Sequence, residues 1–381
     1  MAMTRRERLT AAIRGKAVDR PPVSFYEIGG FRIDPEDPDP FNVYNAPDWR
    51  PLLELAEDET DLIRMRRPRL TPAAGNPLDE FIRNERWFDG DSRFDRTTVT
   101  VAGRTLTRLA RRDAGLDTTW TVEHLLKDTD DLKAYLELPD DIFDFETDVE
   151  ALIEEDEALG DRGIVMPDTS DPLCVAAEMF PMGEYTIVAL TEPELFHRLL
   201  EKLAGPMLDR TRRAAEAFPG RLWRICGPEF ATEPYLPPRL FEEYVVRYTG
   251  PMVRAILDSG GYPRIHCHGR IKAVLPHIVR MGATATDPIE PPPQGDVELA
   301  YVRREYGREL TLFGNIEVTD IENLPPEPFE RVVAASLRDG TAGEGRGFVL
   351  MPTASPYGRT INERTLTNYR TIVRLAKGFR P

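Results

Sequence analysis

Short apolar runs that end at polar, glycine or proline positions recur along this chain of 381 residues. Eight runs have the length of a buried strand, and most segments between them repeat apolar residues with the period of a helix, as in Glu192–Phe218, Pro238–Ser259 and Ile271–Met281. Strands that alternate with helices predict a parallel sheet, and eight such units predict a closed (β/α)8 TIM barrel. The eight runs are Pro22–Glu27, Asp61–Arg66, Gly163–Asp168, Leu222–Gly227, Arg264–His268, Ala283–Pro288, Leu310–Asn315 and Gly347–Pro352.

Two segments depart from the alternation. Residues Thr4–Gly15 place apolar side chains among charges in the pattern of an amphipathic helix, which we expect to cover one end of the fold. Residues Trp87–Trp120 alternate β-branched and polar positions around Ala102-Gly103, which predicts an inserted β-hairpin. We therefore expect residues 1–381 to form one TIM-barrel domain with an N-terminal helix and a hairpin insertion around 87–120.

The charge balance narrows the classes of partner. Acidic residues number 65 and basic residues 49, a net charge of −16, which disfavours nonspecific binding to nucleic acid or to an anionic membrane. A small-molecule substrate or a protein partner fits better, and a homodimer is left open. No signal-peptide pattern or apolar run of about 20 residues is present, and the three cysteines are widely spaced, so we expect a cytoplasmic protein with free thiols.

The most informative chemistry lies in His266-Cys267-His268-Gly269, at the end of a strand-like run. Successive strand residues face opposite sides, so His266 and His268 share one face while Cys267 faces the other. Two imidazoles on the inner face of a barrel could bind one divalent metal ion, zinc or another. The alternative is that one ring bonds a backbone carbonyl and the other meets solvent.

Other polar residues end predicted strands, where barrel enzymes collect their reactive groups. Glu229 is the preferred third metal ligand and Glu27 the next, although each also fits a helix cap or an ion-paired loop carboxylate. The remaining candidates are Asp287 as a general base or a partner to a histidine, Asn315 as a hydrogen-bond donor to substrate or a turn former, and Tyr357 as a gate or proton donor or a packing residue.

Four stretches together resemble the uroporphyrinogen decarboxylase superfamily. They are the N-terminal segment from Arg5-Arg6-Glu7-Arg8-Leu9 to Asp19-Arg20-Pro21-Pro22-Val23, then Cys226-Gly227-Pro228-Glu229-Phe230-Ala231-Thr232, His266-Cys267-His268-Gly269 and Phe313-Gly314-Asn315-Ile316-Glu317. The resemblance implies a (β/α)8 barrel of one of two kinds. One kind decarboxylates tetrapyrroles, and the other comprises zinc-dependent methyltransferases that work with corrinoid proteins.

The sequence is more similar to the methyltransferases. The decarboxylases carry an Arg-Gln-Ala-Gly-Arg loop for the acidic side chains of the tetrapyrrole, whereas residues 25–32 hold no arginine pair and Glu27 would repel a polycarboxylate. The methyltransferases bind zinc through His-x-Cys-Gly and a later cysteine. His266 matches the first ligand, His268 replaces the cysteine, and residues 351–355 hold no thiol, so the implied site has nitrogen and oxygen ligands that suit zinc, iron, nickel or manganese.

Three functions follow. The first is metal-dependent transfer of a methyl group between a small methylated substrate or a thiol and a corrinoid protein. The second is decarboxylase or lyase chemistry on a tetrapyrrole or small carboxylic acid, with Arg64 or Arg66 as the carboxylate anchor. The third is a barrel that binds a tetrapyrrole, a corrinoid or a partner protein without turnover. Charged residues at strand ends favour an enzyme.

Overall fold

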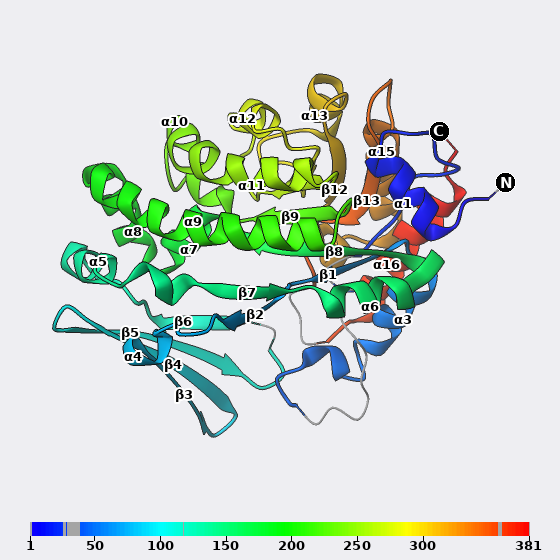
Figure 1. Ribbon diagram of the computed structural model, residues 1–381. Coiled ribbons are helices and arrows are strands. Elements are labelled where there is room, and N and C mark those ends of the chain that lie inside the picture. Colours follow the sequence, from blue (N-terminus) through cyan, green and yellow to red (C-terminus); the bar gives the residue numbers. More distant parts are fainter. Residues whose placement is uncertain (1, 26–27, 29–38, 117, 357–359, 381) are drawn as a thin grey trace.

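A computed structural model describes residues 2–25, 28, 39–116, 118–356 and 360–380 of the chain. Its centre is a curled parallel sheet with the strand order β1-β8-β9-β10-β11-β12-β13 (Figure 1). These strands span Leu62–Arg66, Gly163–Ser170, Leu222–Cys226, Tyr262–His266, Ala285–Asp287, Thr311–Ile316 and Phe348–Pro352, respectively. The protein therefore has an α/β fold of the TIM-barrel type.

The first of the eight predicted strands does not form in the described residues. Around Val23 the chain makes a single parallel bridge to Leu350 of β13. The Ser24 amide donates to the Leu350 carbonyl at 3.0 Å, and the Asp61 amide, just before β1, donates to the Val23 carbonyl at 2.7 Å. This segment thus joins the two edges of the seven-stranded sheet. Pro21 and Pro22 have no N–H to donate, which explains why a full strand cannot extend here.

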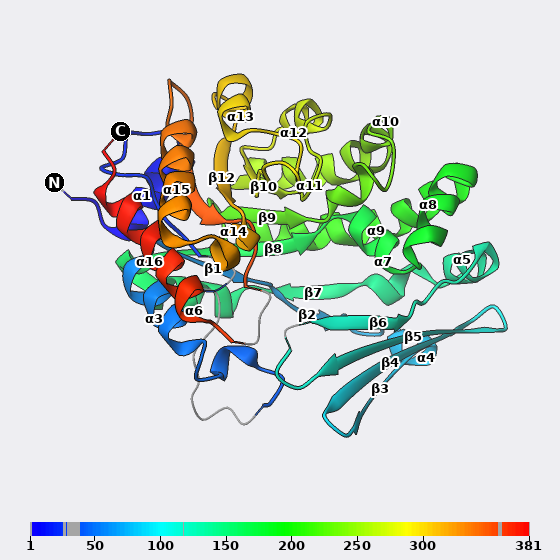
Figure 2. The same ribbon diagram turned by 180° about the vertical axis from the view of Figure 1, so that it is seen from behind.

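Helices surround the sheet (Figures 1 and 2). Those around the barrel are α1 (Arg5–Ile13), α3 (Arg50–Glu59), α6 (Glu150–Leu159), α7 (Pro172–Glu178), α8 (Met182–Thr191), α9 (Pro193–Ala217), α10 (Arg239–Phe241), α11 (Arg247–Asp258), α12 (Leu275–Arg280), α13 (Leu299–Tyr306), α14 (Val318–Asn323), α15 (Pro326–Gly340) and α16 (Glu363–Gly378). Short 3-10 turns occur at Val43–Asn45, Asp140–Phe143, Gly160–Arg162 and Pro228–Ala231, and a π-helical turn at Glu242–Val246 precedes α11. No helix among the described residues is long and apolar enough to cross a membrane.

The predicted N-terminal helix forms as α1, with Thr4 and Glu7 making a capping box. Its apolar face packs against the inward side chains of the strands, in a cluster that includes Leu9, Ile13 and Phe313. One end of the barrel is therefore filled with apolar side chains and covered by α1. The polar inward residues lie further along the strands, toward their carboxyl ends.

The insertion is larger than the predicted hairpin. Strands β4 (Ser92–Val101) and β5 (Arg104–Asp113) pair antiparallel around Ala102-Gly103, as predicted, but β3 (Ile82–Asp89) and β6 (Thr119–Glu123) extend them to a four-stranded sheet. This sheet lies at the lower left in Figure 1, near the short helices α4 (Leu78–Phe81) and α5 (Thr129–Leu136). A separate two-stranded ribbon pairs β2 (Arg69–Pro72) with β7 (Phe145–Asp148).

Candidate active site

Four neighbouring strands carry polar side chains on the inner face of the barrel. Asp168 of β8 lies opposite Arg224 of β9, which lies opposite Arg264 of β10. Two positions further along, His266 of β10 lies opposite Asp287 of β11. Residues at paired positions point to one face, and that face returns at every second residue, so these side chains form two adjoining rows. The rows lie near the carboxyl ends of the strands, where barrel enzymes place their active sites.

Asp287 connects two of these groups. Its Oδ2 lies 2.7 Å from Nδ1 of His266, and its Oδ1 lies 3.1 Å from Nε of Arg264. Both Asp287 and Arg264 are fully buried, and the Arg264 guanidinium lies 4.8 Å above the ring centroid of Phe313. Burial alone would raise the pKa of Asp287, but the charge of Arg264 and the hydrogen bond from His266 outweigh it and hold the pKa at about 2. The carboxylate is therefore ionised at neutral pH.

His266 is held as a neutral imidazole. Burial lowers its pKa, the charge of Arg224 lowers it further, and Asp287 acts in the opposite direction with a smaller effect. We assign the pair as an ionised Asp287 and a neutral His266 whose Nδ1–H donates to the carboxylate. The lone pair of this tautomer lies on Nε2, the atom that would bind a metal ion or accept a proton.

His268, two residues after His266, also has its Nδ1 hydrogen-bonded to a carboxylate. Its Nδ1 lies 2.8 Å from Oε1 of Glu290, and the other carboxylate oxygen accepts the backbone N–H of Gly269. Burial opposes ionisation of Glu290, but these hydrogen bonds and the nearby histidines bring its pKa below the ordinary value. The rings of His266 and His268 are 4.6 Å apart and nearly perpendicular. Two imidazoles, each oriented at Nδ1 by a carboxylate, are typical of metal-binding histidines.

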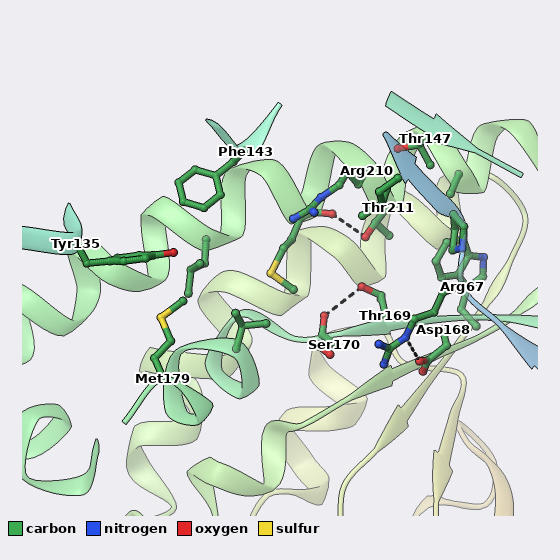
Figure 3. A pocket seen from close by; sticks show the side chains of 17 residues that line it. Arg67, Tyr135, Phe143, Thr147, Asp168, Thr169, Ser170, Met179, Arg210 and Thr211 are labelled. Carbon is green, nitrogen blue, oxygen red and sulfur yellow. Dashed lines mark hydrogen bonds and ion pairs between the residues drawn. The ribbon is translucent and has the colours of Figure 1, made fainter. Parts of the chain in front are cut away.

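A second carboxylate on the inner face lies between two arginines. Arg224 Nη1 donates to Oδ1 of Asp168, and Arg67 Nε donates to Oδ2, each at 2.8 Å. Figure 3 shows the contact between Arg67 and Asp168. Asp168 is buried, so the two guanidinium groups compensate its charge where water cannot. This pairing fixes Arg224 at the position from which its charge keeps His266 neutral.

Glu317 follows β12 near the same end of the barrel. The carboxyl group is buried and accepts a hydrogen bond from the Thr353 hydroxyl at 3.3 Å. Burial and the negative charge of Glu290 raise the pKa of Glu317 above its ordinary value. The mouth of the barrel thus contains a carboxyl group that keeps its proton to a higher pH than an exposed glutamate does.

Glu229 lies in the 3-10 turn that follows β9. Its charge contributes to raised pKa values for Asp171 and Cys267, and one of its oxygens is buried without a hydrogen bond. Among the residues that the structure describes, no three His, Cys, Asp or Glu side chains are close enough to hold a metal ion. The role of Glu229 as a third metal ligand therefore stays a prediction.

Asp171, next to Glu229, gives the stability of the protein a predictable pH dependence. It caps α7 by accepting the Cys174 amide at 2.6 Å, and burial, with a smaller contribution from Glu229, raises its pKa to about 8. The folded state then keeps a proton that the unfolded state loses above about pH 4, so this group makes stability fall as the pH rises toward 8. We expect Asp171→Asn, which keeps a capping side chain, to remove this fall, at most about 1.4 kcal/mol per pH unit.

The measurement is the free energy of unfolding of wild type and Asp171→Asn between pH 5 and pH 8. Asp128→Asn is the matched control, because Asp128 caps α5 with an exposed side chain. A difference between wild type and Asp171→Asn that stays constant with pH would contradict the buried, protonated state of Asp171.

The other predicted residues fall in three places. Asn315 lies on β12, and its side-chain oxygen accepts the Ser336 hydroxyl of α15 at 2.8 Å, so its amide is anchored toward the helices. The suggested carboxylate anchors, Arg64 and Arg66, form ion pairs with glutamates of α3 and α6 outside the barrel. Glu27 and Tyr357 lie outside the described residues.

Sequence reasoning overlooked Arg224, Arg264 and Glu290. The signal for the two arginines was present, because Arg264 lies two positions before His266 and Arg224 occupies the matching position on the preceding strand. The period of two that places both histidines on the inner face also places these arginines there. No comparable signal marks Glu290, since its approach to His268 depends on the path of the loop after β11.

A protein-family model matches much of this sequence. The model of the family described as Uroporphyrinogen decarboxylase (URO-D) matches residues 117–363, about two thirds of the chain. The chain belongs to the uroporphyrinogen decarboxylase family. Both rows of polar residues on β8 to β11 lie within the matched stretch. A comparison with curated proteins found no match.

One solved structure supports the fold of this uroporphyrinogen decarboxylase family member. A methyltransferase from Methanosarcina mazei is similar over 99% of both chains, with a TM-score of 0.62 and 16% identity. The structure of the IOLI protein with a bound zinc atom is a more distant neighbour, with a TM-score of 0.35 and 10% identity over 67% of this chain and 87% of that one. The first likeness covers nearly the whole chain, so it includes the inserted sheet.

Proposed function

We propose that this protein is a methyltransferase that moves a methyl group between a small methylated substrate or thiol and a corrinoid carried by a separate protein. The observation that carries the proposal is the pair His266 and His268 at the mouth of the barrel, each oriented by a carboxylate. The whole-chain likeness to a methyltransferase fold gives further support.

A divalent metal ion, zinc or another, fits part of this site. Asp287 and Glu290 occupy Nδ1 of the two rings, so His266 and His268 would hold the ion through Nε2. Catalytic zinc usually has three protein ligands, and the described part of the chain does not supply the third. When bound, the metal would act as a Lewis acid toward the heteroatom that gains or loses the methyl group.

The protein's own residues have separate tasks in this proposal. Asp287 and Glu290 fix the orientation of the rings, and burial together with the charge of Arg224 lowers the pKa of His266 and keeps it unprotonated. When a methyl group leaves an oxygen or nitrogen atom of the substrate, that atom keeps the bonding electron pair and needs a proton. Glu317, whose pKa is raised at the same mouth, is suited to supply it.

The runner-up, decarboxylation of a tetrapyrrole or another carboxylic acid, requires cations directed at the substrate. The suggested anchors Arg64 and Arg66 are paired with glutamates outside the barrel instead. Glu290 is ionised at the mouth of the barrel, and its negative charge would oppose a polycarboxylate. We therefore favour methyl transfer.

A direct assay would incubate the protein with zinc, cob(I)alamin and a panel of small O-, N- and S-methylated compounds, and follow methylcobalamin by absorbance. We expect methyl transfer with at least one class of donor, retained in His277→Ala, whose half-buried histidine lies on α12, and lost in His268→Ala. Release of CO2 from a tetrapyrrole carboxylate with no methyl transfer would favour the decarboxylase. Ligand binding without either reaction would favour the noncatalytic alternative.

Glu290 gives a finer test of the metal. Glu290→Gln keeps an acceptor for His268 Nδ1 but removes the negative charge, so we expect zinc affinity to fall about 10- to 100-fold. Competition with a coloured chelator measures this affinity. Glu298→Gln is the control, because Glu298 is exposed on the loop that follows Glu290. Equal affinity in the two variants would contradict the assignment of His268 as a ligand.

A further inference from the structure

A cavity of about 370 Å³ lies on the outer side of the barrel wall, within the size range of small-molecule sites. Thr169 of β8 and Trp223 of β9 line it, and each alternates along its strand with an inward residue of the polar rows. Helix α9 forms the opposite wall. The cavity is therefore separated from the histidine pair by the sheet, although its rim includes Asp168.

The two ends of this cavity differ in chemistry (Figure 3). Tyr135, Phe143 and Met179 lie at one end, which is apolar. Arg67 lies at the other end, and Arg210 projects from α9 between them. Threonine hydroxyl groups at positions 147, 169 and 211 surround the polar half. An elongated molecule with one polar head would match this division.

Arg210 sets the charge of the polar half. Its Nε donates to the Pro206 carbonyl at 3.1 Å, and its guanidinium lies 5.8 Å from the ring centroid of Phe145. Within the described part of the chain no carboxylate lies within ion-pair distance of Arg210, whereas Asp168 is already shared by Arg67 and Arg224. Burial lowers the pKa of Arg210, and only the charge of Asp209 opposes this effect.

Arg210 is half-buried, and a cation that is partly removed from water on an apolar wall is stabilised by a nearby anion. The charged lining residues, Arg67, Arg210 and Asp168, sum to one positive charge in a protein of net charge −16. A cationic ligand would meet the same charge, and a neutral one would leave Arg210 uncompensated. An anionic head group satisfies both the charge and the hydrogen-bonding capacity of the guanidinium.

We propose that this cavity is a second ligand site, distinct from the barrel mouth, that binds an amphipathic carboxylate. The carboxylate would pair with Arg210, with Arg67 nearby, and the apolar chain would extend toward Tyr135, Phe143 and Met179. This proposal does not depend on methyl transfer, because it concerns residues on the outer side of β8 and β9.

Calorimetric titration of the full chain with octanoate tests the proposal. We expect saturable binding of one octanoate, and weaker or no binding of octan-1-ol and octyltrimethylammonium. Arg210→Gln should weaken octanoate binding about 10- to 100-fold, the effect of losing a hydrogen-bonded ion pair, while Arg210→Lys retains most of it. Arg213→Gln is the matched control, since Arg213 lies on the same helix with an exposed side chain.

Two further variants locate the ligand. Met179→Trp narrows the apolar end, so it should shift the preference from octanoate toward shorter carboxylates. His266→Ala should bind octanoate as wild type does, whatever its effect on methyl transfer. The proposal is overturned by the absence of octanoate binding, by octan-1-ol binding equally well, by unchanged affinity in folded Arg210→Gln, or by loss of binding in folded His266→Ala.

Discussion

The Asp287→Ala variant is expected to unfold with a free energy about 3–5 kcal/mol below that of wild type. The substitution leaves the guanidinium of Arg264 fully buried without its carboxylate and removes the partner of His266. An uncompensated buried charge is among the costliest defects in a protein interior. Urea unfolding at pH 7, followed by circular dichroism, measures the difference.

A double substitution separates this loss of charge compensation from loss of packing. Arg264→Met combined with Asp287→Leu removes both charges and keeps apolar volume, so we expect it to recover much of the stability that Asp287→Ala loses. The single variants Arg264→Met and Asp287→Leu are measured beside it. If the double variant loses as much unfolding free energy as the two single variants lose together, the Arg264–Asp287 pair is not the source of the effect.

The pH dependence of stability in acid tests the role of the Asp287 carboxylate independently. The pKa of Asp287 in the folded state, about 2, lies below its ordinary value of 3.8. Its contribution is therefore fully present above about pH 4 and is lost as the pH falls toward 2. The difference in unfolding free energy between wild type and Asp287→Asn should shrink by about 2 kcal/mol across that interval.

The His266→Ala variant is expected to lose roughly a thousandfold or more of the rate of methyl transfer, as when a group that acts directly on the reacting atoms is removed. His266 is neutral and buried, and Asp287 fixes it so that Nε2 carries the lone pair. The measurement is the methylcobalamin assay at saturating donor, with the His277→Ala variant as control.

Stability separates this catalytic effect from a structural one. Loss of a buried imidazole leaves a cavity beside Asp287, so His266→Ala is also expected to be less stable. His266→Gln fills most of that space but offers no comparable metal ligand or base. A folded His266→Gln that retains the wild-type rate would exclude His266 from the chemistry.

The regular alternation of strand-like runs with helix-like segments made most of the barrel predictable from the sequence. Runs such as Gly163–Asp168 and Gly347–Pro352 carry apolar residues on both faces because helices cover one side and the barrel interior the other. The segment Pro22–Glu27 is also rich in apolar residues, but Pro21 and Pro22 at its start have no N–H to donate to a neighbouring strand. In the insertion, β3 has apolar residues only near its ends, so no alternation of apolar and polar positions reveals it.

Only the part of the candidate site that follows strand β10 was predictable from the sequence. Period two placed His266 and His268 together, and it could also have placed Arg264 with them. The approach of Glu290 to His268 depends on the loop after β11, where chain direction changes without a repeating pattern. Pairing across loops is a property of the fold rather than of local sequence.

The central claim is that His266 and His268 together bind one divalent metal ion. Elemental analysis of zinc-reconstituted wild type, His266→Ala, His268→Ala and the control His277→Ala tests it most directly. The account predicts about one equivalent of metal in wild type and in His277→Ala, and close to none in the other two variants. Wild type without metal after reconstitution, or metal retained by both His266→Ala and His268→Ala, would contradict it.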